Sequence, residues 1–175
     1  MKIIQAKDKA HLTDVITLYI ETFSKGISQQ DIDLTHLTKH IALFISHGYT
    51  LLAIEENKVI GVLLAYNLNY DQYFPKEDFP HIDYGNSEYI GEVMVKEDFR
   101  GQGIGKELIK TCLNLMQMYQ TTDVYIRVWD QNVEALSLYK KMGFVPFTNI
   151  EQQKTKDNGN EVFTMTKIYL HKKLN

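Results

Sequence analysis

The sequence predicts a mixed α/β domain arranged around one sheet, and three observations lead to that prediction. The chain has 175 residues, which by size form a single domain, expected over residues 1–175. Apolar residues recur at helical spacing, most clearly over residues 12–23, where they return every three or four positions. The predicted elements follow the order strand, two helices, three strands, helix, strand, helix and two strands.

The first half of the chain is predicted to contain three strands and two helices. Ile3-Ile4 begins the first strand, and the apolar spacing predicts a helix over residues 12–23. A second helix is expected from residue 34 to residue 46, where a His-Gly pair ends it. Two β-rich runs, residues 49–55 and 59–68, flank a short polar turn and predict a hairpin.

The next strand, helix and strand form the middle of the predicted sheet. Residues 89–95 predict a strand with Gly91 in its interior, where a glycine often marks a bulge or a close backbone approach. Residues 104–119 present apolar side chains along one helical face, which includes Cys112, so this cysteine is expected in the core. A β-rich strand is predicted over residues 123–129.

The remaining residues predict one helix and a final hairpin. The helix covers residues 131–142, and Gly143 follows it as glycines do at helix C-termini. A strand begins over residues 144–147. Asn158-Gly159 is a strong hairpin turn signal, and the last strand covers residues 161–170.

Composition excludes several classes of protein. The net charge is −3, from 19 basic and 22 acidic residues. No nucleic-acid partner is expected, because proteins that bind a duplex need a basic face. A single cysteine excludes an internal disulfide and zinc sites built from paired cysteines. The first eight residues do not resemble a secretory signal, and no apolar run approaches the roughly 20 residues of a membrane span. A soluble, cytoplasmic protein without a membrane partner is expected.

A glycine-rich turn is the most informative stretch of the sequence. Arg100-Gly101-Gln102-Gly103-Ile104-Gly105-Lys106 lies between the predicted strand 89–95 and the helix that follows it. Free backbone N–H groups and the helix dipole at such a start attract anions, and glycines let a phosphate approach closely. The turn therefore predicts a phosphate or pyrophosphate ligand. The turn is not a Walker loop, because it lacks the Gly-Lys-Ser/Thr of that motif. The alternative to a phosphate site is a tight turn that only packs the helix against the strand.

The same residues resemble a known family. Residues 100–105 match the Arg/Gln-x-x-Gly-x-Gly/Ala signature of the GNAT superfamily of acyl-CoA-dependent N-acyltransferases. Val93-Met94-Val95 resembles the family's fourth strand. The family's second motif resembles residues 132–144, in the pattern Asn132-x-x-Ala135-x-x-x-Tyr139-x-x-x-Gly143-Phe144. The resemblance implies a mixed, mostly antiparallel central sheet flanked by helices and splayed between the fourth and fifth strands.

The resemblance also implies roles for individual residues, with acetyl-CoA as cofactor. The turn would hold the CoA pyrophosphate, the fourth strand would pair with the pantetheine arm, and Tyr139 would act as general acid. Core packing is the alternative for Tyr139, and helix capping is the alternative for Asn132. The residues implied in cofactor binding are Val93, Met94, Val95, Arg100, Gly101, Gln102, Gly103, Ile104, Gly105, Lys106, Asn132 and Tyr139.

The general base is less clearly indicated. Glu92 is the nearest candidate, but successive strand residues face opposite ways, so Glu92 and Gly91 share a face only if a bulge intervenes. Glu88 and Asp83 are alternatives that would act through water. Arg127 is expected to be a surface or ion-pair residue. No metal is expected, because the His36/His40 pair lacks a carboxylate partner at metal-site spacing.

The connection over residues 70–89 is a candidate acceptor site. It holds five acidic residues against one lysine, with six aromatic residues between them. Carboxylates attract ammonium groups and aromatic faces bind cations, which favours a cationic amine or a basic peptide. The alternative is a surface loop anchored by its aromatic side chains. The candidate substrate-binding residues are Asp78, Asp83, Tyr84 and Glu88.

The resemblance therefore implies an N-acetyltransferase that moves an acetyl group from acetyl-CoA to a primary amine by direct attack in a ternary complex. A cationic small molecule is the expected acceptor, and a protein N-terminus or lysine is the alternative. A non-catalytic acyl-CoA sensor or binding module is the alternative from another class. The resemblance also allows a homodimer.

Overall fold

The computed structural model describes residues 1–7, 9–25 and 27–174. Eleven helices and strands follow one another in the order predicted from the sequence. They are β1 (Lys2–Ala6), α1 (Leu12–Lys25), α2 (Leu34–His47), β2 (Gly48–Glu55), β3 (Lys58–Asn67), β4 (Ser87–Val95), α3 (Ile104–Met118), β5 (Asp123–Trp129), α4 (Val133–Lys141), β6 (Val145–Lys156) and β7 (Glu161–Lys173). The predicted element order is confirmed, and β5 has the predicted bounds.

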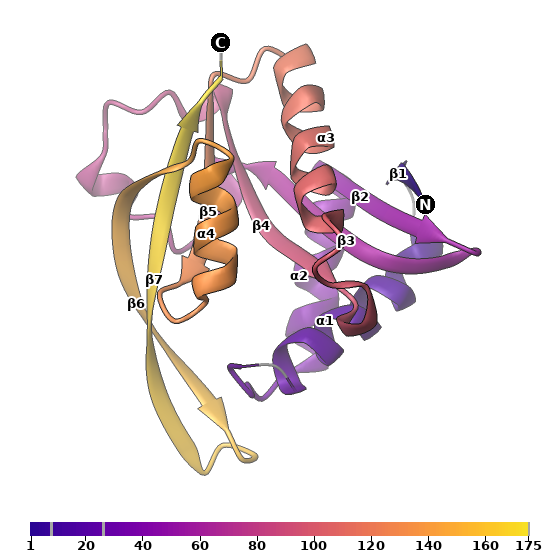
Figure 1. Ribbon diagram of the computed structural model, residues 1–175. Coiled ribbons are helices and arrows are strands. Elements are labelled where there is room, and N and C mark those ends of the chain that lie inside the picture. The colour runs from indigo at the N-terminus through magenta and orange to yellow at the C-terminus, as the bar shows by residue number, and fades with distance from the viewer. Residues whose placement is uncertain (8, 26, 175) are drawn as a thin grey trace.

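The strands form one seven-stranded sheet in the order β1-β2-β3-β4-β5-β7-β6 (Figure 1). All neighbours are antiparallel except β4 and β5, which run parallel. The predicted class, a mixed and mostly antiparallel sheet with flanking helices, is confirmed. The β2–β3 turn carries Glu56 and Asn57 at positive φ, which matches the right-handed twist of a tight hairpin.

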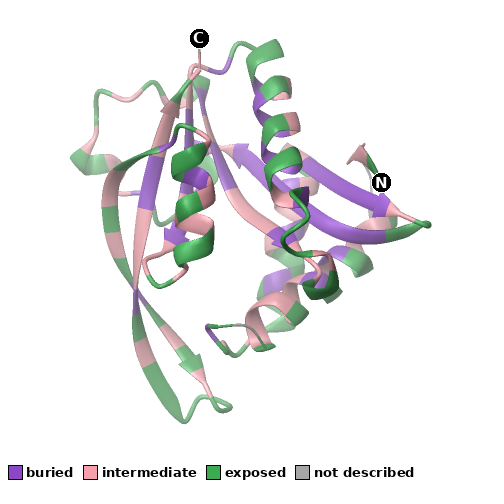
Figure 2. Cartoon of the chain, viewed as in Figure 1, coloured by how far each residue is buried: buried purple, intermediate pink, exposed green. Residues whose placement is uncertain are grey.

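Helices cover both faces of the sheet, so the domain has two hydrophobic cores. One core lies between the sheet and α1 and α2, with Ile41 and Phe44 fully buried. The other lies between the sheet and α3 and α4, and it includes Leu108 and the predicted core residue Cys112. Figure 2 shows the buried strands between helices whose outer surfaces are exposed. No helix in the described ranges combines the length and apolarity needed to span a bilayer.

Strands β4 and β5 pair over only four residues and then separate. Their register runs from Ser87 opposite Asp123 to Ile90 opposite Ile126, and no pair follows. On its other edge β4 stays paired with β3 as far as Val95. The edge of β4 that faces β5 therefore loses its strand partner halfway along, and the two ribbons diverge in Figure 1. This is the splay that the resemblance implied.

A bulge at Gly91 coincides with the start of that separation. Leu64 on β3 opposes Glu92 and Ala65 opposes Ile90, so Gly91 is the extra residue. A Cβ atom at Gly91 would lie 2.5 Å from Cζ of Phe44, which is fully buried on α2. The predicted bulge is therefore present, and only a residue without a side chain fits against Phe44.

The bulge decides which face each β4 side chain occupies. Tyr89 and Met94 belong to the core under α1 and α2, whereas Ile90 belongs to the core under α3. Glu92 lies on the α2 side, where its Oε1 is 3.8 Å from Nε2 of His40. Without the extra residue, alternation would turn Glu92 toward the opposite face.

Glu88 lies on β4 directly before Tyr89, and alternation turns it toward α3. Its Oε2 atom is buried and has no hydrogen-bond partner in the described part of the chain. Burial raises the pKa of Glu88 to about 7. Burial first, and next the charge of Glu88, raise the pKa values of Tyr49 and Cys112. Glu88 therefore lies beside the α3 core.

The long connection before β4 is pinned by aromatic packing. Phe74 is buried, and its ring contacts those of Tyr84, Tyr125 and Tyr169 at centroid distances of 5.1 to 6.1 Å. The Tyr84 hydroxyl donates to two carbonyl oxygens within the same connection. Asp83 accepts hydrogen bonds from the Gly85 backbone and the Asn86 side chain. These contacts agree with the alternative interpretation, a surface loop anchored by its aromatic residues.

The tip of the β6–β7 hairpin is attached to the segment between α1 and α2. The Asp31 backbone N–H donates to the Thr155 carbonyl at 2.8 Å. Its carboxylate accepts from the Asn158 and Gly159 backbone N–H groups at 3.1 and 2.8 Å. The predicted Asn-Gly turn is confirmed, and it bridges to the helical layer on the α1–α2 side of the sheet.

Replacing Gly91 with alanine should destabilise the protein. The new Cβ would overlap Phe44, which is enclosed and cannot move aside, and overpacking of this kind costs about 1–3 kcal/mol. Urea unfolding measures the loss. Gly105→Ala is the matched control, because its Cβ would meet its nearest atoms at 3.8 Å and is expected to cause no destabilisation. Equal stability of the two variants would contradict the role given to the bulge.

Glu88→Gln should make stability less dependent on pH. The folded pKa of Glu88 is about 7 and its ordinary value is 4.5, so the folded state binds an extra proton between these values. Wild-type stability therefore falls as pH rises from about 4.5 to 7, and the variant avoids this loss. We expect the variant to be about 1–3 kcal/mol more stable at pH 8. The difference should be small near pH 4, and thermal unfolding at both pH values provides the test.

Candidate active site

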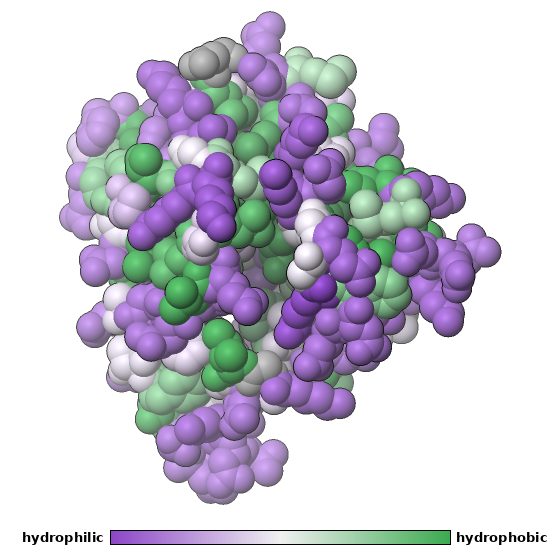
Figure 3. Space-filling model, viewed as in Figure 1, coloured by the Kyte–Doolittle hydropathy of each residue, from purple (hydrophilic) through white to green (hydrophobic). Residues whose placement is uncertain are grey.

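One cavity of about 990 Å³ is lined by residues from both faces of the sheet. On the α3–α4 face it touches the glycine-rich turn and the first part of α4. On the α1–α2 face it touches both of those helices and strands β5, β6 and β7. Glu92 and the residues around it on β4 line it where β4 and β5 separate. Figure 3 shows a hollow with an apolar floor between the polar outer surfaces of α3 and α4.

The glycine-rich turn has the geometry of an anion site. Gly101 and Gly103 have φ values of +75° and +81°, and a Cβ atom at either would meet nothing within 4 Å. Asp33 and Asn132 cap α2 and α4 through side-chain hydrogen bonds, whereas α3 begins without a side-chain cap from any described residue. The first residues of α3 line the cavity, and their N–H groups have no side-chain cap from the described residues. There is open space beside the turn, so a pyrophosphate fits here.

The remaining residues of the turn contribute charge and support. Lys106 lines the cavity from the first turn of α3. Arg100 also lines it, and its Nε donates to the Val95 carbonyl at 3.2 Å, which ties the turn to the end of β4. Ile104 is buried in the α3 core, so its contact with a ligand is through the backbone. Gln102 is exposed, and its side chain donates to the Asp98 carbonyl at 3.4 Å.

The free edge of β4 supplies backbone groups to the cavity. Val93 and Val95 pack their side chains against the α3 core, and Met94 packs its side chain on the opposite side. Because β5 does not pair with this part of β4, main-chain groups of residues 91–95 line the gap. An extended ligand can therefore pair with this edge as a strand would.

Asn132 and Tyr139 come from α4, on the same side of the cavity. The Asn132 Oδ1 atom accepts from the Ala135 backbone N–H at 3.1 Å, so the capping interpretation is correct. Asn132 also lines the cavity. Tyr139 is 6% exposed and lines the cavity as well. Burial, and next the charge of Glu92, raise the pKa of Tyr139 above its ordinary value, so its phenol stays protonated at neutral pH.

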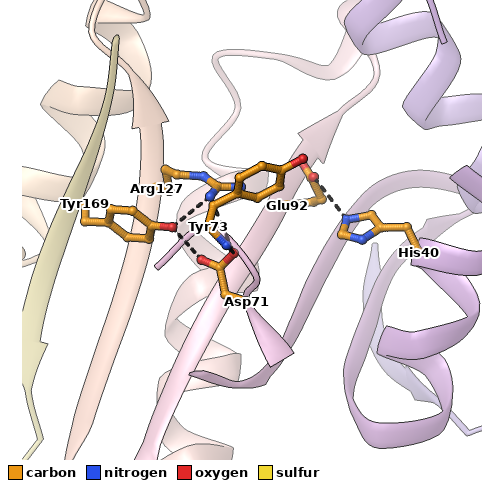
Figure 4. Close-up of polar contacts among 6 residues, drawn as sticks. All are labelled: His40, Asp71, Tyr73, Glu92, Arg127 and Tyr169. Atoms are coloured by element: carbon orange, nitrogen blue, oxygen red, sulfur yellow. Dashed lines mark hydrogen bonds and ion pairs between the residues drawn. The ribbon is translucent and has the colours of Figure 1, made fainter. Parts of the chain in front are cut away.

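On the α1–α2 face, Glu92 is the carboxylate at the point of strand separation. Its side chain is 17% exposed and points toward the His40 ring (Figure 4). The His40 ring packs edge-on against Phe44, the residue that excludes a side chain at Gly91. One packing arrangement therefore fixes both the bulge and the imidazole beside Glu92.

A polar network borders the same cavity: Asp71, Tyr73 and Arg127 line it, and the fully buried Tyr169 bonds to Asp71 and Arg127. The Tyr169 hydroxyl donates to Asp71 at 2.6 Å and accepts from Arg127 at 2.7 Å (Figure 4). Arg127 Nη1 is 3.5 Å from Asp71 Oδ1, and the guanidinium lies 5.0 Å and 5.6 Å from the ring centroids of Tyr73 and Tyr89. Arg127 is thus an ion-pair residue, as expected, but it lies in the cavity wall with its side chain 15% exposed.

Sequence reasoning missed most of this network. Asp71 and Tyr73 belong to the connection that was expected to carry the acceptor site, but they were not singled out there. Tyr169 lies within a predicted strand, and the sequence alone gives it no further role. Period-two spacing on β5 and β7 would have placed Arg127 and Tyr169 on the same face as the buried Tyr125.

The four residues expected to bind the acceptor do not line this cavity. Asp78 is exposed on the connection, and Asp83 and Tyr84 hold that connection together. Glu88 faces α3. His36 and His40 both line the cavity, and the described residues include no group of three His, Cys, Asp or Glu side chains arranged to hold a metal ion.

Relatives with named activities match part of the chain. A spermine/spermidine N(1)-acetyltransferase of Bacillus subtilis is 27% identical over 70 residues, which are 38% of this chain and 46% of that protein. N-alpha-acetyltransferase 30 of Saccharomyces cerevisiae is 33% identical over 66 residues, 38% of each chain. The chain thus spans less than half of the length of either relative.

The whole fold is similar to solved structures. One is yncA, a putative acetyltransferase from Salmonella typhimurium determined with its cofactor acetyl-CoA. It superposes with a TM-score of 0.73 over 100% of this chain and 94% of that one, at 16% identity. The model of the acetyltransferase (GNAT) family matches residues 12–144, which include the glycine-rich turn, the open edge of β4 and Tyr139. The resemblance in the sequence is thereby confirmed, and the chain belongs to the acetyltransferase (GNAT) family.

Proposed function

We propose that the protein is an N-acetyltransferase that transfers the acetyl group of acetyl-CoA to the primary amine of a small molecule. One observation carries the proposal: a single cavity joins the uncapped start of α3 and Tyr139 to Glu92 on the other face of the sheet. Donor and acceptor can therefore approach from opposite faces and meet where β4 and β5 separate. This arrangement suits direct attack in a ternary complex.

The donor half of the cavity suits acetyl-CoA. The N–H groups between Gly101 and Lys106 would hold the pyrophosphate, with Arg100 and Lys106 adding positive charge. The free β4 edge at Val93 and Val95 would pair with the pantetheine arm. The similarity to a structure determined with acetyl-CoA supports this assignment at the level of the fold.

The reaction divides between residues on the two sides of the gap. The amine loses a proton to Glu92, directly or through a water molecule, and its nitrogen attacks the thioester carbonyl. A backbone N–H near Val93 would stabilise the negative charge that develops on the carbonyl oxygen. As the C–S bond breaks, the Tyr139 phenol would donate its proton to the departing sulfur. The attacking nitrogen would then pass its remaining excess proton to the Tyr139 phenolate, directly or through water, which leaves a neutral amide and restores the phenol. Burial raises the pKa of Tyr139, and it also raises the pKa of a desolvated thiol. The phenol that gives the proton and the sulfur that takes it therefore keep similar proton affinities.

The enclosure of the acceptor half supports a small molecule. The β6–β7 tip is bonded to Asp31, so the hairpin bridges to the segment between α1 and α2. A protein N-terminus is the second candidate, because the yeast relative is named as an N-alpha-acetyltransferase. The Bacillus subtilis relative is named for polyamine acceptors. A non-catalytic acyl-CoA binding module is the remaining alternative and would leave Tyr139 without a role in turnover.

Tyr139→Phe tests the general acid. Removing the hydroxyl takes away a proton donor at the leaving group, which is worth at least about 100-fold in rate. We expect kcat to fall by about that factor while the calorimetric Kd for acetyl-CoA stays unchanged. Thiol release from acetyl-CoA, measured across a panel of amines, gives the rate. An unchanged kcat would remove Tyr139 from the mechanism, and binding without turnover of any amine would favour the non-catalytic module.

Glu92→Gln tests the base. An alkyl ammonium group with a pKa of about 10.4 costs about 4.6 kcal/mol to deprotonate at pH 7, so loss of a base matters most for such acceptors. We expect kcat/KM to fall about 100-fold at pH 7, with a smaller effect as pH approaches the pKa of the amine. Asp78→Asn removes an exposed carboxylate outside the cavity and should leave kcat/KM unchanged. Equal behaviour of the two variants would exclude Glu92 as the base.

A further inference from the structure

Two lysines of the β6–β7 hairpin line the acceptor half of the cavity. Lys167 is two residues after Met165 on β7, so the two side chains share a face, and both line the cavity. Lys154 lies on β6, and the register pairs Lys154 with Phe163 and Gln152 with Met165. Both lysines are only partly exposed. Burial lowers the pKa of Lys167, and the charges of Arg127 and Lys154 lower it further.

Neither lysine has a charge partner in the part of the chain that the structure describes. Within the described residues, neither side-chain ammonium makes an ion pair or a hydrogen bond, although Glu92 lies within electrostatic range of both. Lys156, two residues further along β6, pairs with Glu161 at 2.9 Å. Burial lowers the pKa of Lys154, and it lowers the pKa of Lys167 to about 8. Two desolvated positive charges near one another are costly unless an anion accompanies them.

The carboxylates on this side of the cavity are already engaged. Asp71 accepts from Tyr169 and pairs with Arg127. Asp31 accepts two backbone N–H groups at the hairpin tip, and Asp33 caps α2. Glu92 is directed toward His40. Within residues 1–7, 9–25 and 27–174, no carboxylate therefore lies at hydrogen-bond distance from either lysine.

Gln152 provides a second, independent observation. It is 7% exposed, it lines the cavity, and its amide makes no hydrogen bond to the described part of the chain. On the hairpin it is two residues from Lys154, and its partner Met165 is two residues from Lys167. Its amide atoms are not among the fully buried polar atoms that lack a partner, so the amide reaches the cavity surface. It can therefore hydrogen-bond a polar ligand there without giving up a bond within the described chain.

We propose that the amine acceptor also carries an anionic group, a carboxylate or a phosphonate, which Lys154, Lys167 and Gln152 bind. This inference rests on the proposed function and names the class of its substrate. The acceptor is then zwitterionic, with its anion at the hairpin and its ammonium near Glu92. A polyamine would instead bring further positive charge beside Lys154, Lys167 and Arg127, which disfavours polycations.

Matched acceptor pairs test the inference on the intact protein. Thiol release from acetyl-CoA is measured with amino acids, with their C-terminal amides, and with aminoalkyl phosphonates. The amide keeps the amine and removes the anion, and the phosphonates distinguish the two kinds of anion. We expect wild type to prefer the anionic member of at least one pair by tenfold or more in kcat/KM. The inference would be overturned if the amides or the polyamines gave a kcat/KM as high as that of every anionic acceptor.

The double variant Lys154→Met/Lys167→Met separates this preference from the different basicity of the amines. The ratio of kcat/KM for an anionic acceptor to that for its amide should fall about tenfold or more, chiefly through KM. Lys156→Met removes a paired lysine outside this cavity and should leave the ratio unchanged. Unfolding of the double variant should show no loss of stability, because unpaired, partly buried charges are removed. An unchanged ratio in a folded double variant would also overturn the inference.

Failure of the proposed function gives a different result, because then no amine of any charge releases thiol. The anion site is still testable in that case with inorganic phosphate, added after saturating CoA has filled the turn at Gly101–Lys106. The inference expects phosphate to raise the Tm of wild type and of Lys156→Met but not that of the double variant. Equal shifts in all three proteins would overturn the anion site independently of activity.

Discussion

The structure depends on the loss of pairing between β4 and β5 after Ile90 and Ile126. A parallel pair that continued would close the sheet and leave no passage between its two helical layers. Pairing stops next to Gly91, where β4 has its bulge and where the ring of Phe44 packs against the backbone. The fold tolerates the unpaired edge because β4 stays bonded to β3 and β5 to β7. Each strand thus keeps one complete ladder while its other edge borders the cavity.

The bulge has a second effect, because it reverses the alternation of side chains along β4. Tyr89, Glu92 and Met94 share the face of α1 and α2, while Val93 and Val95 pack toward α3. One strand therefore offers backbone groups to the cavity on the α3–α4 face and a carboxylate to the cavity on the α1–α2 face. The sheet becomes a partition with one opening, and the chemistry on its two faces is set by a single inserted residue.

Much of the fold could be predicted because its signals are local. Apolar spacing, the two hairpin turns and the glycines after β4 are each contained in a few neighbouring residues, and the element order followed from them. Gly91 could be marked as a bulge for the same reason. The donor half of the candidate site was predicted by a compact motif, although its residue-by-residue roles stay proposals.

The acceptor half could not be predicted in this way because it forms through contacts distant in the sequence. Asp71 and Tyr169 are 98 residues apart, and Arg127 bonds to both. The acidic residues near β4 suggested an amine-binding loop from composition alone. Composition could not show that Phe74 would pin that loop, or that alternation would turn Glu88 toward α3.

The missing cap of α3 has a thermodynamic consequence for the whole domain. The other two helices that begin beside the cavity, α2 and α4, carry their own side-chain caps, so their ends are complete in the free protein. Under the proposed function, the pyrophosphate of acetyl-CoA would bind the free N–H groups at the start of α3. Part of the stability of this helix would then come from the ligand and depend on its concentration. A ligand present at 100 times its Kd adds about 2.7 kcal/mol to folding. The resistance of such a domain to unfolding would therefore rise and fall with the supply of its own substrate.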